Sequence, residues 1–195
     1  MSVARPLTLA DVAAPQSNAL TNTLLVVAAS LVTAAAAQVE IRLPWTPVPI
    51  TGQTFAVLLS GAVLGARRAF LAQVLYLAEG ASGLPFFSGG AAGLAKLVGP
   101  TGGYLASFPF AAALTGFLAE RAWDRKPVTM FLAMLAGSGL IFGLGLAQLS
   151  RFVPASSLLA SGLLPFIPGD LVKAALAAGV FPATWKFVSR LGGRA

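Results

Sequence analysis

Long apolar runs, interrupted by short polar or Gly/Pro-rich segments, dominate the pattern of the chain. Because the hydrocarbon core of a bilayer is about 30 Å thick, an α-helix needs about 20 apolar residues to cross it. Four runs reach this length, and they cover residues 20–39, 104–122, 128–150 and 171–188. The pattern therefore predicts an all-α integral membrane protein in which these four segments span the membrane.

The region between Ile50 and Leu84 holds two further apolar stretches, each shorter than a standard span, on either side of Arg67 and Arg68. One long helix would place both arginines at membrane depth, where each costs about 2.5–3.5 kcal/mol on insertion scales. Two short helices that turn at residues 65–68 avoid this penalty. The sequence therefore predicts six transmembrane helices.

Basic residues are distributed unequally over the two sides of these six helices. With both termini cytoplasmic, nine lie on the inner side, three on the outer side, and Lys173 lies in the sixth span. The inner set is Arg5, Arg67, Arg68, Arg121, Arg125, Lys126, Lys186, Arg190 and Arg194, and the outer set is Arg42, Lys96 and Arg151. This bias follows the positive-inside tendency. Merging the second and third spans gives a similar bias in the opposite sense, so the arginine penalty is what favours six helices.

Three parts follow from this topology. Residues 1–19 form a cytoplasmic N-terminal segment, residues 20–188 a six-helix membrane domain, and residues 189–195 a cytoplasmic basic tail. An alternative for the first span is a signal peptide, because the apolar run from Leu24 to Val32 is followed by small residues. Against it, only Arg5 offers a basic n-region, far from the apolar run, and the remaining spans need a partner helix.

Composition agrees with a membrane protein and narrows the chemistry. Hydrophobic residues make up 57% of the chain and charged residues 10%, against about 25% charged in soluble domains, which excludes a water-soluble globular fold. The chain has no Cys and no His, which excludes disulfides, zinc fingers and catalysis by thiolate or imidazole. The net charge of +7 is explained by orientation in the membrane, so no nucleic-acid partner is expected.

The outer loops are rich in Gly and Pro, and a charged pair stands where one of them meets the sixth span. Pro168 and Gly169 end the loop, Asp170 occupies the expected N-cap of the helix, and Lys173 follows on the same face. A capping aspartate with a lysine that reaches the interface would be a purely structural explanation. Ionisable residues in a chain so poor in charge also mark a functional site.

Two other outer segments carry candidate ligand-binding residues. Residues 47–54 offer Thr51 or Thr54 as a potential helix cap, and Gln53, whose amide both donates and accepts hydrogen bonds. Residues 83–104 are Gly-rich, lack a phosphate-binding loop motif, and include Phe86, Gly89, Gly90 and Tyr104. Helix capping and core packing remain alternatives for both segments. In the first span Ala29, Thr33 and Ala37 form a face of small residues, which suits packing within the monomer or docking of another membrane protein.

Four motifs, taken together and in order, make the sequence resemble the BioY family, the substrate-capture (S) components of energy-coupling-factor biotin transporters. They are Pro47–Thr54, Gly83–Phe86, Gly99–Tyr104 and Pro168–Lys173, and the likeness covers about residues 28–188. The resemblance implies a non-catalytic six-helix monomer, multi-pass in the bacterial cell membrane among its lipids, with biotin under the Gly/Pro-rich outer loops. It needs no cofactor, and its partners are a transmembrane coupling (T) subunit and two energy-coupling ATPase subunits.

The resemblance also implies roles for individual residues. Asp170 and Lys173 contact the polar groups of biotin, with Thr51, Gln53 and the Gly-rich loop that contains Gly89 and Gly90 as helpers. Trp45, Phe86 and Tyr104 are expected to form apolar walls. The family's first helix often carries two alanines, spaced by three residues, for docking. In this sequence Thr33 stands between Ala29 and Ala37 at the corresponding positions, so the docking face is not identified. An S component for thiamine or riboflavin stays an alternative, and an intramembrane enzyme is a weaker one, because the outer side offers few carboxylates and no His or Cys.

Overall fold

The computed structural model describes residues 8–15 and 18–192, and these residues are mainly helical. The elements in chain order are α1 (Leu9–Ala13), α2 (Ala19–Gln38), β1 (Glu40–Ile41), β2 (Ile50–Thr51), α3 (Gln53–Leu64), α4 (Ala66–Ala81), η1 (Ser88–Gly90), α5 (Ala95–Val98), α6 (Gly102–Ala119), η2 (Trp123–Arg125), α7 (Pro127–Leu149), η3 (Ala155–Ser157), α8 (Leu158–Gly162) and α9 (Ile167–Gly192). Arg5 and Arg194, counted above on the inner side, lie outside the described residues.

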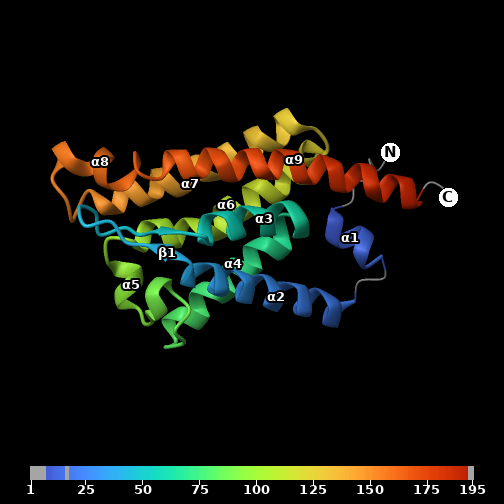
Figure 1. Ribbon diagram of the computed structural model, residues 1–195. Coiled ribbons are helices and arrows are strands. Elements are labelled where there is room, and N and C mark those ends of the chain that lie inside the picture. The colour runs from blue at the N-terminus through green and yellow to red at the C-terminus, as the bar shows by residue number, and fades with distance from the viewer. Residues whose placement is uncertain (1–7, 16–17, 193–195) are drawn as a thin grey trace.

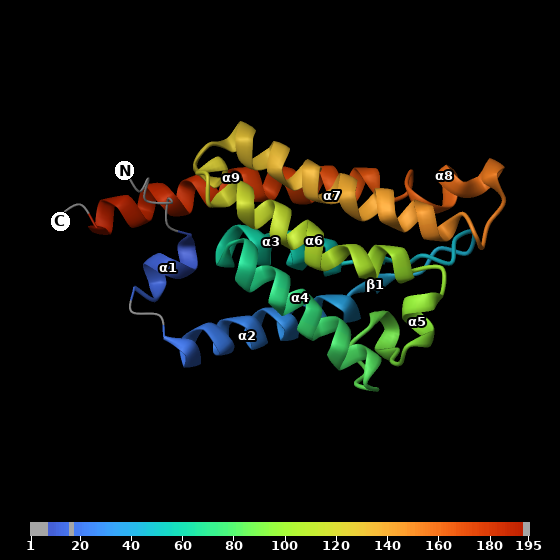
Figure 2. The ribbon, with the colours of Figure 1, turned by 180° about the vertical axis from the view of Figure 1, so that it is seen from behind.

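The long helices run roughly along one direction and give the molecule two distinct ends (Figure 1). Helix α6 is the central element, because it packs against α3, α4 and α7, while α2 packs on α4 and α9 on α7. The antiparallel β1–β2 pair, α5 and α8 gather at one end, which we call the loop end. Helix α1 and the last turns of α9 lie at the other, which we call the α1 end, and the reverse view shows the same separation (Figure 2).

The predicted break between the second and third apolar stretches is present at Gly65. This residue has φ +82°, a left-handed conformation that favours glycine, and it separates α3 from α4. The side chain of Glu120 accepts a hydrogen bond from the backbone N–H of Ala66 at 2.8 Å, which satisfies one free donor at the start of α4. Arg67 is exposed, and Arg68 forms an ion pair with Asp11 of α1 at 2.6 Å. The break therefore keeps both arginines at the α1 end.

Four segments are long and apolar enough to cross a membrane, namely Ala19–Gln38, Gly102–Ala119, Pro127–Leu149 and the helical region Ala155–Arg190. They correspond to the four long predicted runs. Helix α3 has 12 residues and α4 has 16, so both are shorter than a standard span. The expected N-cap role of Asp170 is wrong, because α9 begins at Ile167 and the N–H of Asp170 bonds the carbonyl of Phe166 at 2.9 Å.

The small-residue face of α2 is used inside the chain. Ser30, Thr33, Ala34 and Ala37 are buried, and the amide Nε2 of Gln73 on α4 donates to Thr33 Oγ1 at 3.1 Å. Threonine at position 33 thus serves the packing of α2 on α4. The N-terminal segment also holds a feature that the apolar pattern did not predict. Thr8 and Asp11 form a capping box that starts α1, and the ion pair with Arg68 attaches this short helix to α4.

Candidate functional site: a cavity at the loop end

A cavity lined by 18 residues lies at the loop end between the starts of α3, α6 and α9. Its polar lining residues are Thr51, Gln53, Thr54, Ser88, Lys96, Thr101, Asp170 and Lys173. Its other lining residues are Val48, Pro49, Ile50, Phe87, Tyr104, Leu105, Phe108, Phe142, Phe166 and Gly169. The cavity therefore combines apolar walls with a few polar groups.

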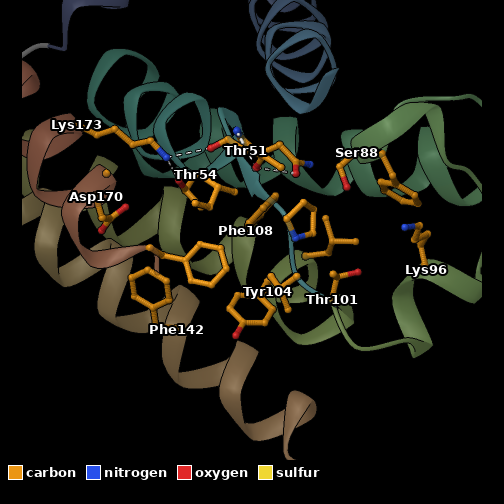
Figure 3. Close-up of a pocket in the computed structure, with 18 residues that line it drawn as sticks. Thr51, Thr54, Ser88, Lys96, Thr101, Tyr104, Phe108, Phe142, Asp170 and Lys173 are labelled. Carbon is orange, nitrogen blue, oxygen red and sulfur yellow. Dashed lines mark hydrogen bonds between the residues drawn. The ribbon is translucent and has the colours of Figure 1, made fainter. Parts of the chain in front are cut away.

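Asp170 and Lys173 both come from the first turns of α9 and lie on the same side of the cavity (Figure 3). Asp170 is 7% exposed. Its carboxylate stands near the positive end of a long helix dipole, which stabilises a negative charge there. Lys173 Nζ donates hydrogen bonds to the carbonyl of Thr51 at 3.0 Å and to the hydroxyl of Thr54 at 2.9 Å. The lysine thus reaches across from α9 to the start of α3.

Thr51 and Gln53 form a second polar group beside Lys173. The Thr51 hydroxyl accepts from the backbone N–H of Gln53 at 3.3 Å and donates to Gln53 Oε1 at 3.1 Å. The N-cap of α3 is Gly52, which has no side-chain cap hydrogen bond, so Thr51 is not the helix cap. Thr51 precedes the cap, accepts the N–H of Gln53 and lines the cavity. Gln53 is 5% exposed, and its Nε2 donates to the hydroxyl of Tyr76 at 2.5 Å.

Aromatic side chains supply most of the apolar wall, and they come from several elements. Tyr104 and Phe108 are four residues apart on α6, so they share one face of that helix. The Tyr104 hydroxyl donates to the carbonyl of Gly162 at 2.7 Å, which ties α6 to α8. Phe142 of α7 and Phe166 have ring centroids 6.2 Å apart. The aromatic rings thus form an apolar wall opposite and between the polar lining residues.

Lys96 stands on the opposite side of the cavity from Asp170 and Lys173 (Figure 3). It belongs to the short helix α5, near Ser88 and Thr101 in the lining, and it is partly exposed. The cavity thus has a carboxylate and an ammonium at one side and a second ammonium at the other. Such an arrangement suits an elongated ligand with polar groups at both ends and an apolar middle.

Five of the nine residues predicted for the site line this cavity, namely Asp170, Lys173, Gln53, Thr51 and Tyr104. The other four lie outside its lining. Trp45 is 62% exposed in the β1–β2 loop. Gly89 and Gly90 are exposed, and the N–H of Gly90 donates to Gln38 Oε1 at 3.1 Å. Phe86 is partly buried against the core and contributes its backbone carbonyl to Tyr76.

Several lining residues were not among the nine predicted for the site. Phe87, adjacent to Phe86, is 1% exposed and packs its ring over Gly80 of α4. The available sequence signal was Gly80, which lacks a side chain and so leaves room for a large ring beside α4. Phe108 repeats the position of Tyr104 one helical turn later, which would have identified it. Phe142 carries no local signal, because only the packing of α7 brings it to the cavity. Lys96 was noted for its charge on the outer side but was not assigned to a site.

Within residues 8–15 and 18–192 no three acidic side chains gather into a group that could hold a metal ion. The polar groups that line the cavity can form hydrogen bonds and ion pairs. A buried carboxylate accepts N–H donors, an ammonium donates to a carbonyl or carboxylate, and the aromatic wall encloses an apolar ring.

Comparison with known proteins points in one direction. The family model described as "BioY family" matches residues 9–190. The "Probable biotin transporter BioY" of Pyrococcus horikoshii is 39% identical over 74% of this chain and 84% of its own length. The "Biotin transporter BioY" of Rhizobium etli is 40% identical over 71% of this chain and 78% of its own length. The "Biotin transporter BioY" of Thermotoga maritima is 41% identical over 71% of this chain and 81% of its own length.

A solved structure shares the fold. It is the crystal structure of the S-component for biotin from an ECF-type ABC transporter, which superimposes with a TM-score of 0.75. The alignment covers 86% of this chain and 92% of the other, at 26% sequence identity. The overall fold is thus shared with a protein described as the S-component for biotin.

Proposed function

The chain belongs to the BioY family, and on that premise we propose that it is the biotin-binding S component of an energy-coupling-factor biotin transporter. The observation that carries this proposal is the cavity at the loop end, where Asp170 and Lys173 face Lys96 across an aromatic chamber. The names of the relatives and of the solved structure support it.

Biotin has the groups that this cavity complements. Its ureido ring carries two N–H donors and one carbonyl acceptor, its thiophane ring is apolar, and its valerate chain ends in a carboxylate. A ligand carboxylate beside Asp170 would be repelled in a low-dielectric chamber. We therefore place the ureido ring at Asp170 and Lys173, with Asp170 accepting from the ureido nitrogens and Lys173 donating to the ureido oxygen.

In this orientation the valerate chain crosses the cavity toward Lys96. Phe87, Phe108 and Phe142 then contact the thiophane ring and the methylene groups. Lys96 pairs with the carboxylate close to the mouth, where partial exposure lowers the desolvation penalty of both charges. Gln53 and Thr51 lie beside Lys173 and complete the ureido side. Trp45, Phe86, Gly89 and Gly90, which lie outside the lining, are not assigned to the ligand in this arrangement.

The same proposal covers the membrane setting. Helices α2, α3, α4, α6, α7 and α9 are the six membrane-spanning helices, with the loop end outside and both termini in the cytoplasm of a bacterial cell. Residues 1–19 and 189–195 flank this domain on the inner side. Helices α3 and α4 are each shorter than a standard span. Both pack against α6, which shields their backbone from lipid and lets each of them cross the membrane.

The protein binds and delivers its ligand without chemistry of its own. The chain holds neither His nor Cys. The cavity offers one carboxylate and two ammonium groups, a set that is not typical of general acid–base catalysis. Uptake then depends on a transmembrane coupling subunit and two ATPase subunits, because the sequence contains no nucleotide-binding loop. Its proposed partners are these subunits and the surrounding lipid. No nucleic-acid partner is proposed.

Calorimetric titration of the purified protein in detergent tests the ligand. Biotin is expected to bind tightly, whereas thiamine and riboflavin are expected to give no binding. Asp170→Asn is expected to weaken biotin binding strongly, because an amide replaces one oxygen acceptor by a donor that opposes the ureido N–H groups. Asp11→Asn, at the α1 end, is the matched control and keeps the affinity. Absence of heat with biotin, or tight binding of either other vitamin, would refute the assignment.

Cysteine labelling tests the orientation. The chain has no native Cys, so one introduced cysteine gives an unambiguous signal. Arg67→Cys is expected to react with a membrane-impermeant maleimide only from the cytoplasmic side, and Arg42→Cys only from the outside. The reversed pattern would contradict the proposed topology while leaving the biotin assignment intact.

A further inference from the structure

Tyr76 lies directly behind the cavity and contacts three parts of its wall without lining it. Its side chain is fully buried. Its ring meets Phe87 edge to face, with centroids 5.7 Å apart, and lies nearly parallel to Phe108 at 6.4 Å. Its hydroxyl lies 2.5 Å from Gln53 Nε2 and 3.2 Å from the carbonyl oxygen of Phe86. One side chain of α4 thus connects the start of α3 to the loop that follows α4.

The direction of these hydrogen bonds is determined by their chemistry. The carbonyl of Phe86 can only accept, so the Tyr76 hydroxyl donates its single proton there. The oxygen of Tyr76 is then an acceptor, and the group of Gln53 that faces it must be the NH₂. On the other side, the Thr51 hydroxyl accepts a hydrogen bond from the backbone N–H of Gln53 and donates its own proton to Gln53 Oε1.

The amide of Gln53 is therefore held in one of its two orientations from both sides. These bonds leave the amide one remaining N–H and one remaining lone pair on Oε1, on a residue that lines the cavity. If the amide rotated by half a turn, its oxygen would face a hydroxyl whose proton is already committed to Phe86. A buried donor or acceptor left without a partner costs more than a single hydrogen bond contributes. The Tyr76 hydroxyl therefore disfavours this alternative, because it could donate to the rotated amide oxygen only by giving up its bond to the Phe86 carbonyl.

We propose that Tyr76 is a positioning residue for the ligand site, which fixes the orientation of the Gln53 amide before the ligand arrives. This inference rests on the proposed function, because it concerns the same cavity. A site that is already oriented does not lose free energy in ordering its side chains on binding. Tyr76 acts through Gln53 and does not touch the ligand, so its removal changes affinity only as long as the Gln53 amide is present.

A double-mutant cycle tests this dependence. Tyr76→Phe keeps the ring and its aromatic contacts but removes the hydroxyl. The dissociation constant for biotin, measured by calorimetry, is expected to rise about tenfold in this variant. In a Gln53→Ala background, the same Tyr76→Phe change is expected to have no further effect. Thr115→Val, which removes another fully buried hydroxyl outside the cavity lining, is the matched control and leaves the affinity unchanged.

The outcomes separate this inference from the proposed function. A wild-type protein that does not bind biotin would refute the function itself. Tight biotin binding by the wild type together with unchanged affinity in Tyr76→Phe would overturn only the role of Tyr76. An equal loss of biotin affinity on Tyr76→Phe with and without Gln53 would also overturn the role of Tyr76. The hydroxyl would then affect binding through general stability of the fold and not through the Gln53 amide.

A second measurement applies if Tyr76→Phe does not fold. In the wild-type protein, NMR of the Gln53 side-chain amide is expected to show one proton with slow exchange, held by Tyr76. Rapid exchange of both amide protons would overturn the inference without any substitution.

Discussion

The ammonium group of Lys173 donates a hydrogen bond to the backbone carbonyl of Thr51 at 3.0 Å, across the gap between α9 and α3. The residues are far apart in sequence, yet this contact and the bond to Thr54 hold the first turns of the two helices together. Both acceptors are uncharged, and these two bonds use two of the three N–H donors of an ammonium group. The same side chain therefore shapes the cavity and presents a donor to it.

Replacement of Lys173 by Met, which has a similar length and no charge, is expected to raise the dissociation constant for biotin on the order of 10- to 100-fold, as for loss of a hydrogen bond to a charged group. Thr54→Val removes only one of the lysine's acceptors and is expected to have a much smaller effect. Lys186→Met, an exposed lysine at the other end of α9, is the control. Calorimetric titration of the three variants makes the comparison, and unchanged affinity in Lys173→Met would contradict the assigned role.

Much of the helical architecture could be predicted from the sequence, because it depends on local properties. Apolar run length identifies the four long helices, and the desolvation of Arg67 and Arg68 predicts the break at Gly65. The start of α9 was misplaced, since proline and glycine at positions 168 and 169 were interpreted as a loop. Proline is well tolerated in the first turn of a helix, where its missing N–H has no partner to lose.

Prediction of the cavity was partial for a different reason. Asp170, Lys173, Thr51 and Gln53 were identifiable because polar residues in an apolar chain stand out. The aromatic wall could not be identified in this way. Phe142 is one of many apolar residues on α7, and only tertiary packing directs it to the cavity. Trp45 and Phe86 were chosen for their position in loops, whereas close packing over Gly80 selects Phe87.

Lys96 provides a prediction about the other end of the ligand. If it pairs with the valerate carboxylate, Lys96→Gln weakens binding of biotin about tenfold. It leaves binding of the uncharged biotin methyl ester unchanged, because the ester has no charge to lose. Lys173→Met is the internal comparison and weakens both ligands, since both keep the ureido ring. Competition titrations with the acid and the ester measure this, and equal weakening of both by Lys96→Gln would place the carboxylate elsewhere.

Asp124 gives a prediction on pH and stability at the α1 end. It is 1% exposed in the turn between α6 and α7, and its Oδ2 accepts from Trp185 Nε1 of α9 at 2.5 Å. Burial raises the pKa of Asp124 above its ordinary value of 3.8, and the hydrogen bond from Trp185 and the charge of Arg125 offset this only in part. Between the ordinary and the raised pKa the folded state binds more protons than the unfolded state, so this group lowers stability as pH rises.

The variant Asp124→Asn cannot ionise and lacks this dependence. Its melting temperature relative to that of the wild type is therefore expected to increase as the pH is raised from below 3.8 through the folded-state pKa. Thermal unfolding in detergent over a series of pH values measures the difference. Asp11→Asn provides an opposite control, because Arg68 and Thr8 hold the pKa of Asp11 below its usual range despite partial burial. A difference between Asp124→Asn and wild type that stays flat with pH would contradict the prediction.

Gly65 is expected to be intolerant of a side chain. Its φ of +82° disfavours other residues, and a Cβ atom there would come within 2.6 Å of Glu120 Oε1, the acceptor for the N–H of Ala66. Gly65→Ala is therefore expected to destabilise the fold by about 1–3 kcal/mol, seen as a lower melting temperature. Biotin affinity at the loop end stays unchanged in the folded fraction. Gly139→Ala is the matched control, because a Cβ on that glycine of α7 meets no atom within 4 Å and alanine has the higher helix propensity. Equal melting temperatures for the two variants would show that the break between α3 and α4 does not depend on the left-handed glycine.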